Sequence, residues 1–494
     1  MISYWIKSDE INNDIFIPKY YNPEIQSTLE KLSVTHDCMT VKELVGRGII
    51  SHATGHEIGK GAYGTGDIPF VRTSDISNWE IKAVPKQGVD RKIYEEYSSK
   101  QDVREGDILL VRDGTYLIGS NCFITQVDKE LIYQSHIIKI RVNEPEFLAP
   151  ELLFLLLNSE IVQSQIRSFQ FTADIIDTIG QRFNELVIPI PKSESLKAAL
   201  VTEAKQALSQ RIFGKALIKQ SSKIIEEILL TNSVSPLEEF VSKSLDDIAD
   251  SLSTETVTSE FGGFNTFFIN SAEIKENIFI PKYYDPTIDE ELESISSTCE
   301  LITMGELKKT RKIEYFTGDE IGKMAYGTGE IPFIRTSDFS NWEIKHDPKQ
   351  GISEAIYEEY SVKQDVREND ILLVRDGTYL VGTSCLVTSY DSKSLFCGGL
   401  YKIRSNDPDF LNPFLFLGLL NSYIVKRQIR TKQFTRDVID TIGNRIDEVI
   451  IPIPKSVDVK KAIAEAVKKT IDARIESREN ISTLSKKVAE VSAG

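Results

Sequence analysis

The chain has 494 residues, which is too long for a single hydrophobic core and predicts roughly two to four domains. Its 58 basic and 74 acidic residues give a net charge of −16, which argues against a simple non-specific nucleic-acid binder but leaves room for local basic faces. The five cysteines have no metal-type spacing, and no signal peptide or membrane-spanning run is found, so we expect a cytoplasmic protein with reduced thiols.

The first half of the chain is repeated in the second half at an offset of 263 residues. The segment QDVREGDILLVRDGTYLIG at Gln101–Gly119 returns as QDVRENDILLVRDGTYLVG at Gln364–Gly382, with 17 of 19 positions identical. Further matches on both sides need no gap, so Tyr4–Leu230 corresponds to Phe267–Ala493. A repeat of this length indicates two duplicated domains with closely similar folds, not a solenoid of short repeats.

Within the first copy, short apolar and β-branched runs closed by Asp, Ser, Gly or Pro predict strands that end in turns. These runs are Ile68–Ile76, Gly106–Gly114, Ile137–Val142 and Leu186–Pro191. Before the last run, Pro150–Phe169 is apolar on one face at helical spacing, which predicts one helix. The first half of each copy is therefore expected to be strand-rich, with a helix near its end.

A long amphipathic segment follows the strands of each copy. In Ser193–Leu230 the apolar residues recur at spacings near three and four, and Ser456–Val491 has the same pattern. An isolated helix with such a stripe needs a surface to pack on, so we expect the two long helices to pack on each other. The polar segment Thr231–Phe264 between them is interpreted as the connection into the second copy.

Together these features predict an α+β protein with two similar strand-rich domains and two long helices that separate them. The predicted boundaries are 1–192 for the first domain, 193–232 for the central helix, 233–266 for the connecting segment, 267–455 for the second domain and 456–494 for the C-terminal helix.

Catalytic groups are expected twice in a duplicated enzyme, and the histidines do not meet this expectation. The five histidines are His36, His52, His56, His136 and His346, and none faces another histidine at the 263-residue offset. The chain also has no Walker-type phosphate loop and no Asp/Asn-Pro-Pro-Tyr/Phe stretch of the kind that base-amino methyltransferases use. The sequence therefore indicates a chain that does no chemistry alone.

One acidic group does repeat, because Asp75, Glu80 and Lys82 return as Asp338, Glu343 and Lys345. Metal-dependent nucleases use such residues to hold Mg²⁺ and to activate water. The short spacing across a Ser-Asn turn favours a structural role instead, with Trp79 packed on the sheet. A stand-alone magnesium-dependent nuclease stays an alternative, and a protein-binding scaffold without a DNA role is a second one, for which the amphipathic helices would suffice.

Polar side chains recur beside the predicted turns of both copies. Arg, Gln and Asn suit base edges in the major groove, whereas Thr, Tyr and Lys suit phosphate oxygens. Arg112 could equally pair with Asp113 or Asp107 and only hold its turn. The candidate DNA-binding residues are Tyr63, Arg72, Ser74, Asn78, Lys86, Gln87, Arg112, Thr115, Tyr116, Gln170 and Thr172 in the first copy, and Tyr326, Arg335, Ser337, Asn341, Lys349, Gln350, Arg375, Thr378, Tyr379, Gln433 and Thr435 in the second.

The motifs GDILLVRDGTYLIG and IPFVRTSDI, in the order domain, long helix, domain, long helix, resemble the specificity subunit of type I restriction–modification systems over almost the whole chain. The resemblance implies two target recognition domains that each read half of a split double-stranded DNA site. It also implies two antiparallel spacer helices that form a coiled coil and dock two methyltransferase subunits. Those partners would carry S-adenosylmethionine and methylate adenine N6, so no cofactor or metal is expected in this chain, and a separate restriction and translocase subunit would cut unmodified DNA.

The two copies are more alike than the recognition domains of this family often are. The resemblance therefore implies a bipartite site whose halves are similar inverted sequences, close to an interrupted palindrome. Positions that break the repeat near turns, such as Ala173 against Arg436 and Ala83 against His346, are where the halves would differ. Relatives of this subunit also serve type IIB-like enzymes and other phage-defence systems, so these stay alternatives for the complex to which the chain belongs.

Overall fold

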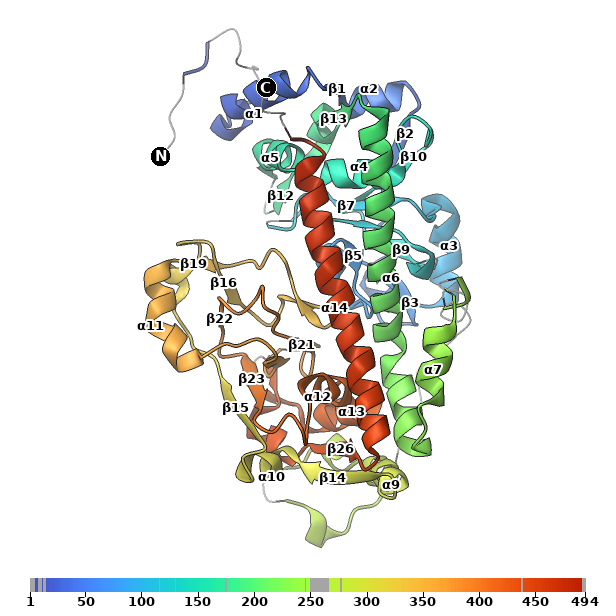
Figure 1. The fold of residues 1–494 in the computed structure, drawn as a ribbon, viewed down its shortest axis with the longest axis vertical. Coiled ribbons are helices and arrows are strands. Elements are labelled where there is room, and N and C mark those ends of the chain that lie inside the picture. The colour runs from blue at the N-terminus through green and yellow to red at the C-terminus, as the bar shows by residue number, and fades with distance from the viewer. Residues whose placement is uncertain are drawn as a thin grey trace. The chain divides into compact units, whose positions relative to one another are not determined.

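The structure is a computed structural model that describes residues 5–7, 11, 15–114, 116–128, 130–173, 176–244, 246–248, 266–275, 278–377, 379–436 and 439–490. The chain divides into two compact units (Figure 1). The first includes Met1–Ile212 and Arg474–Gly494, and the second includes Phe213–Ile248 and Glu260–Ala473. Each unit therefore holds one strand-rich module and a part of each long helix.

A four-stranded antiparallel sheet in the order β2-β10-β7-β8 lies at the centre of the first module. Its strand β7 (Ile108–Val111) is fully buried, because the sequence ILLV places an apolar side chain on both faces. A three-stranded sheet in the order β6-β3-β9 adjoins it, and there β3 runs parallel to β9. The other strands of these two sheets are β2 (Ile50–Thr54), β10 (Ile137–Val142), β8 (Asn121–Phe123), β6 (Gly88–Val89), β3 (Ile68–Val71) and β9 (Ile132–Tyr133).

Short helices and three strand pairs complete the first module. The strand pairs are β1 (His36–Thr40) with β13 (Val187–Pro191), β4 (Ile76–Ser77) with β5 (Glu80–Ile81), and β11 (Phe171–Ala173) with β12 (Ile176–Thr178). The helices are α1 (Pro23–Leu32), α2 (Val41–Gly46), α3 (Arg91–Gln101), α4 (Pro150–Leu157) and α5 (Glu160–Phe169).

The second module repeats this topology element by element. Its sheets have the orders β15-β23-β20-β21 and β19-β16-β22, and its strand pairs are β14-β26, β17-β18 and β24-β25. The strands are β14 (Cys299–Thr303), β15 (Ile313–Thr317), β16 (Ile331–Ile334), β17 (Phe339–Ser340), β18 (Glu343–Ile344), β19 (Gly351–Ile352), β20 (Ile371–Val374), β21 (Ser384–Leu386), β22 (Leu395–Phe396), β23 (Leu400–Ser405), β24 (Phe434–Arg436), β25 (Ile439–Thr441) and β26 (Ile450–Pro454). The helices are α9 (Pro286–Ile295), α10 (Met304–Lys309), α11 (Glu354–Gln364), α12 (Pro413–Leu420) and α13 (Tyr423–Lys432).

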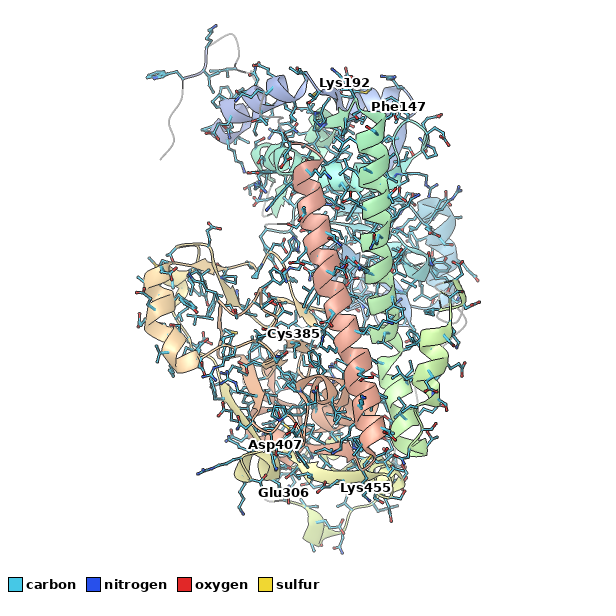
Figure 2. All side chains as sticks on the ribbon, viewed as in Figure 1. Phe147, Lys192, Glu306, Cys385, Asp407 and Lys455 are labelled. Atoms are coloured by element: carbon cyan, nitrogen blue, oxygen red, sulfur yellow. The ribbon has the colours of Figure 1, made fainter. Side chains whose placement is uncertain are left out.

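Equivalent side chains make equivalent bonds in the two modules. The ammonium group of Lys192 donates to the carbonyl oxygens of Ser33 and Val34 at 2.8 and 3.2 Å. Lys455 does the same with Ser296 and Ser297 at 2.8 and 3.1 Å, and Figure 2 labels both lysines. The unchanged register of the repeat thus extends to individual hydrogen bonds, and the predicted α+β class with two similar modules is confirmed.

The single helix predicted at Pro150–Phe169 is wrong, because α4 and α5 are separate helices. The break falls at Asn158 and Ser159, where the Ser159 hydroxyl donates to the carbonyl oxygen of Leu156 at 2.6 Å. Asn158 also accepts a bond from the indole nitrogen of Trp79 at 3.0 Å. Polar side chains with local and tertiary partners interrupt the helix here, although the apolar pattern continues across the break.

The long helices α6 (Glu194–Thr231) and α14 (Val457–Lys487) pair in an antiparallel direction within each unit (Figure 1). In the first unit the Ser477 hydroxyl donates to the carbonyl oxygen of Ala207 at 2.8 Å, and Leu200 shares an apolar core with Leu484. In the second unit the ammonium nitrogen of Lys469 lies 5.4 Å from the ring centroid of Phe213, and Ile463 and Ile225 both approach Gly418 of α12. Since residue numbers rise along one helix as they fall along the other, the predicted antiparallel packing is confirmed inside each unit.

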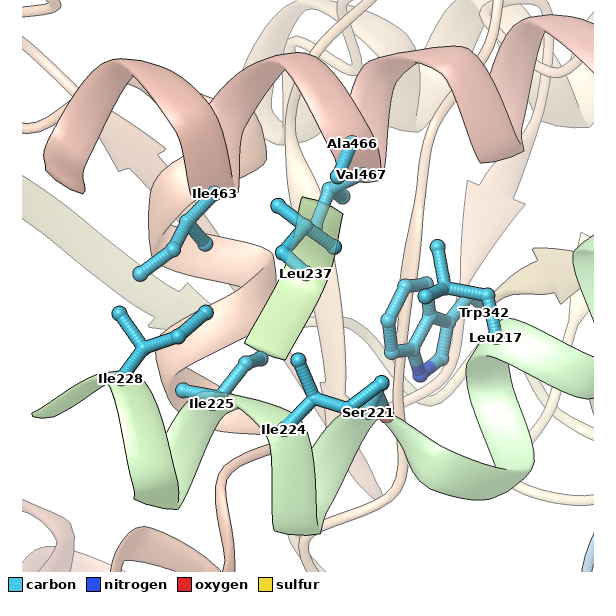
Figure 3. Close-up of a pocket in the computed structure, with 10 residues that line it drawn as sticks. All are labelled: Leu217, Ser221, Ile224, Ile225, Ile228, Leu237, Trp342, Ile463, Ala466 and Val467. Atoms are coloured by element: carbon cyan, nitrogen blue, oxygen red, sulfur yellow. The ribbon is translucent and has the colours of Figure 1, made fainter. Parts of the chain in front are cut away.

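The second unit contains an apolar pocket beside these helices, shown in Figure 3. The helix α7 (Ser235–Ser242) contributes one of its walls. The lining residues are Leu217, Ser221, Ile224, Ile225, Ile228, Leu237, Trp342, Ile463, Ala466 and Val467. Among the described residues, no helix combines the length and the apolar character needed to cross a lipid bilayer.

Candidate nucleic-acid interface

The end of β7 and the β11–β12 hairpin form one connected polar surface in the first module. The amide of Gly114 donates to the carbonyl oxygen of Asp177 at 2.9 Å, and the amide of Ile179 donates to that of Arg112 at 3.2 Å. Gly114 has a φ of 132°, a conformation that favours glycine, so the turn GDILLVRDG can fold back onto the hairpin. We call the residues Arg112, Asp113, Gln170, Thr172 and Asp177 the strand-end cluster.

Asp113 anchors one part of the strand-end cluster. Its buried carboxylate accepts bonds from Arg112 at 2.6 Å and from Nδ1 of His136 at 2.9 Å, and a further bond from the Thr178 hydroxyl. Burial raises the pKa of Asp113, but the bonds from Arg112, Thr178 and His136 outweigh burial and lower it overall. Asp113 therefore stays ionised and holds the guanidinium group of Arg112, which is the structural role that the sequence left open.

Asp177 anchors the other part. Its carboxylate accepts a bond from the Gln170 amide at 2.8 Å and one from the Thr172 hydroxyl at 2.6 Å. Those two bonds lower the pKa of Asp177. Thr172 is exposed and Gln170 is half-buried, so the hairpin presents a fixed amide and a fixed hydroxyl at its surface.

The second module repeats this cluster with Arg375, Asp376, Gln433, Thr435 and Asp440. Asp440 accepts bonds from Gln433 at 2.7 Å and from Thr435 at 2.6 Å. Gln433 is only 4% exposed and also accepts a bond from Arg430. The amide of Gln433, a predicted DNA-binding residue, is thus bonded to both Asp440 and Arg430.

A second group of predicted residues surrounds the buried carboxylate of Asp75, directly after β3. This carboxylate accepts bonds from the backbone amides of Arg72 at 3.0 Å and Lys86 at 3.3 Å. The guanidinium of Arg72 lies 5.9 Å from the ring centroid of Tyr63. The residues Tyr63, Arg72, Ser74, Lys86 and Gln87 thus lie together, and we call them the loop cluster.

The loop cluster of the second module is organised in the same way. Arg335 donates its backbone amide to Asp338 at 2.9 Å, and its guanidinium lies 5.8 Å from the ring centroid of Tyr326. Burial raises the pKa of Asp338, although the amide of Arg335 opposes that effect. Lys349 is exposed, and Ser337 and Gln350 are half-buried.

The loop and strand-end clusters adjoin each other in each module. In the first module, residues 134–136 link the two clusters. The backbone amide of Gln134 donates to the carbonyl oxygen of Val71 at 3.0 Å, and the backbone amide of Arg112 donates to the carbonyl oxygen of His136 at 2.9 Å. In the second module the equivalent backbone amides are those of Cys397 and Arg375. They donate to the carbonyl oxygens of Ile334 at 3.0 Å and Gly399 at 2.9 Å, respectively. Backbone hydrogen bonds therefore connect the two clusters in each module.

Four other predicted residues need separate comment. Tyr116 and Tyr379 are 40% and 37% exposed beside the strand-end turns. Thr115 and Thr378 lie outside the described residues.

Asn78, a predicted DNA-binding residue, is only 1% exposed. It lies in the β4–β5 hairpin turn with a φ of 51°, followed by Trp79 with a φ of 63°. Asparagine tolerates this left-handed conformation better than most residues, so Asn78 serves the turn. Asn341 has the same conformation, with a φ of 50°, and is half-buried.

The nuclease alternative finds no assembled site. Asp75 is bound by backbone amides, whereas the buried carboxylate of Glu80 accepts bonds from Arg211 at 3.3 Å and from Arg474. Over the described part of the chain, no group of three or more His, Cys, Asp or Glu residues could hold a metal ion. The two carboxylates are thus committed to different structural partners.

Sequence reasoning missed an arginine clamp at the start of β7, at the end of this strand opposite the strand-end turn. The guanidinium of Arg141 binds the buried carboxylate of Asp107 at 2.7 and 2.8 Å and the carboxylate of Asp102 at 2.7 Å. Arg404 repeats these bonds with Asp370 and Asp365. Identity of these residues between the copies was the available signal, but their pairing depends on strand register.

No protein-family model matches the chain. No curated protein matches it either. Solved structures do match, and one is the S subunit of a type I restriction–modification system from M. genitalium. It is 12% identical, with 92% of this chain and 95% of that chain covered, at a TM-score of 0.33.

Two further structures match over a similar length. A chain from a study of complex assembly and conformational transition in the type I R-M system is 15% identical, with 92% and 96% covered, at a TM-score of 0.27. The HsdS subunit from Thermoanaerobacter tengcongensis is 13% identical, with 93% and 94% covered, at a TM-score of 0.25. With TM-scores this low, the similarity adds no weight to a particular function, which has to rest on the chain's own residues.

Proposed function

We propose that this chain is the non-catalytic DNA-recognition subunit of a restriction–modification complex or a related phage-defence complex. The observation that carries the proposal is the pair of loop and strand-end clusters that recurs with the same residue types in both modules, where Asp75 and Asp177 of the first module correspond to Asp338 and Asp440 of the second. Each module would read one half of a bipartite site. Two readers on one chain suit a split site better than they suit a single catalytic centre.

The chemistry of these clusters suits DNA. A guanidinium group can bond the guanine edge at two points, and hydroxyl groups and lysines suit phosphate oxygens. The anchoring aspartates Asp177 and Asp440 fix Thr172 and Thr435 on short hairpins. Side chains fixed in advance lose less entropy on binding, so they can support specific recognition.

The acidic net charge of −16 is explained if partner subunits supply much of the phosphate-facing surface. Two methyltransferase subunits would dock on the paired helices α6 and α14, and they would carry S-adenosylmethionine for methylation of adenine N6. Restriction and translocase subunits would join the same complex. We therefore expect weak DNA binding by the isolated chain and tight binding after the methyltransferase is added.

The near identity of the modules leads us to propose a site with two similar inverted halves. The strand-end and loop clusters differ little between the copies, so the halves should share most of their bases.

The test replaces Arg72 and Arg335 together by alanine. We expect loss of methylation at the target site while the complex still assembles, because both guanidinium groups lie on the surface proposed to face DNA. Exposed Lys31 and Lys309 lie outside both clusters, and their double alanine variant removes the same charge and should keep methylation. Cleavage of DNA by the isolated chain with Mg²⁺ would support the nuclease alternative instead.

A further inference from the structure

The arginine at the strand-end turn is held in two different ways in the two modules. In the first module, Nε of Arg112 lies 3.0 Å from both carboxylate oxygens of Asp113, and Nη2 lies 2.6 Å from Oδ2. These contacts occupy the Nε–Nη2 edge of the guanidinium group, one of the edges through which arginine forms two parallel bonds to a base.

Arg375, the equivalent arginine of the second module, makes different contacts. Its Nη1 atom lies 3.6 Å from Oδ2 of Asp376, beyond hydrogen-bond range, and donates instead to the carbonyl oxygen of Gly398 at 3.2 Å. Its guanidinium lies 5.8 Å from the ring centroid of Tyr401 and bonds that side chain. Both arginine side chains are 28% exposed, so burial does not distinguish them.

Two substitutions between the copies account for the difference. His136 and the Thr178 hydroxyl both bind Asp113 and hold its carboxylate against Arg112. Gly399 replaces the histidine in the second module, and within the described residues Oδ1 of Asp376 and Nε of Arg375 are buried without a hydrogen-bond partner. Tyr401 replaces Ile138 and offers an aromatic face to the guanidinium group.

We propose that Arg375 reads a guanine in the second half-site, whereas Arg112 is withheld by Asp113 and gives no base preference at the equivalent position of the first. His136 is then a positioning residue that acts through Asp113. The two half-sites are alike except at this base pair, where only the second requires G·C. This inference rests on the proposed function and deepens it.

The test replaces each arginine by glutamine in the host strain and compares the sequences around modified adenines. Arg375→Gln removes the guanine requirement of the second half-site, a loss of discrimination of roughly 5- to 150-fold. Arg112→Gln leaves the base preferences of the first half-site unchanged. An Arg375→Lys variant, which keeps the charge but not the fork, gives the same loss of preference and covers the case in which glutamine prevents assembly.

A gain-of-preference variant tests the positioning role separately. His136→Gly combined with Ile138→Tyr gives the first module the surroundings of the second, so the first half-site acquires a guanine preference. His136→Asn preserves the wild-type site, because its amide can still donate to Asp113.

The outcomes separate the inference from the proposed function. If the wild-type chain directs methylation but the two arginine variants change both halves equally, or change neither, the inference is overturned. If deletion of the chain leaves the pattern of modified adenines unchanged, the proposed function itself fails.

Discussion

At the scale of single residues, aspartates set the geometry of both modules. Asp113 and Asp177 each fix polar side chains of the strand-end cluster, and Asp102 and Asp107 hold the arginine clamp at the start of β7. Because each carboxylate accepts several bonds in its ionised form, the modules depend on the charge of these groups.

Acid should weaken the modules through Asp102 and Asp365. Bonds from Arg104 and Arg141 lower the pKa of Asp102 to about 2, and bonds from Arg404 and Arg367 do the same for Asp365. Since the unfolded value is about 3.9, these carboxylates stabilise the fold above roughly pH 4, and that contribution is lost as the pH falls towards about 2.

Urea unfolding at several pH values measures this effect. The wild-type chain should lose stability between about pH 4 and pH 2, and a double variant with Asp102→Asn and Asp365→Asn should be less stable at neutral pH and less sensitive to acid. Equal pH dependence of both proteins would show that these carboxylates do not contribute as described.

Sequence reasoning located the polar residues near turns but could not assign their surroundings. The run GDILLVRDG correctly indicated a strand followed by a turn. The burial of Asn78 and Gln433 was not foreseeable, because burial depends on which segments cover a turn. No functional role was predicted for His136, because it has no equivalent histidine in the second copy. The structure nevertheless places it in direct contact with Asp113.

At the scale of elements, one buried ionic cluster joins the β4–β5 hairpin to both long helices within the first unit. Glu80 follows the hairpin turn, Arg211 comes from α6 and Arg474 comes from α14. The side chains are 7%, 3% and 1% exposed, respectively. The cluster therefore fixes the hairpin on the helix pair with charges that have little access to water.

The sequence predicted the two long helices, but it did not predict the buried ionic cluster that joins them to the hairpin. The apolar stripes of α6 and α14 indicated that the two helices pack together. The bond between Glu80 and Arg474 joins residues 394 positions apart in the chain. Neither spacing nor composition reports such a contact, because it depends on the tertiary position of the hairpin.

Removal of the Glu80 charge should destabilise the first unit strongly. Glu80→Gln leaves Arg211 and Arg474 buried with less compensation, and we expect a loss of about 3–5 kcal/mol in the free energy of unfolding. Glu203→Gln is the matched control, because Glu203 pairs with Lys487 at 3.9 Å on the surface and should contribute at most about 1 kcal/mol. Similar losses in the two variants, measured by urea unfolding, would contradict the buried cluster.

At the scale of the whole molecule, the unchanged 263-residue register gives the chain two equivalent readers. Repetition was the strongest signal in the sequence, because it requires no knowledge of the fold. It extends to matching hydrogen bonds, such as those of Lys192 and Lys455. Each residue that differs between the copies is therefore informative, because most of the residues around it are the same in both modules.

Replacement of the second module by the first should make the site symmetric. A chain in which residues 278–455 are replaced by residues 15–192 keeps its length, because the repeat has no gap. We expect the complex to methylate a strict interrupted palindrome made of two copies of the first half-site. Methylation of the original site by this chain would show that the modules do not determine sequence.

The most direct test of the central claim is sequencing of the modified adenines in DNA from the host. We predict one motif of two similar inverted halves separated by a fixed interval, which disappears when the chain is deleted. Modified adenines that persist without the chain, or a motif whose halves are unrelated in sequence, would contradict the account of two matched DNA-reading modules.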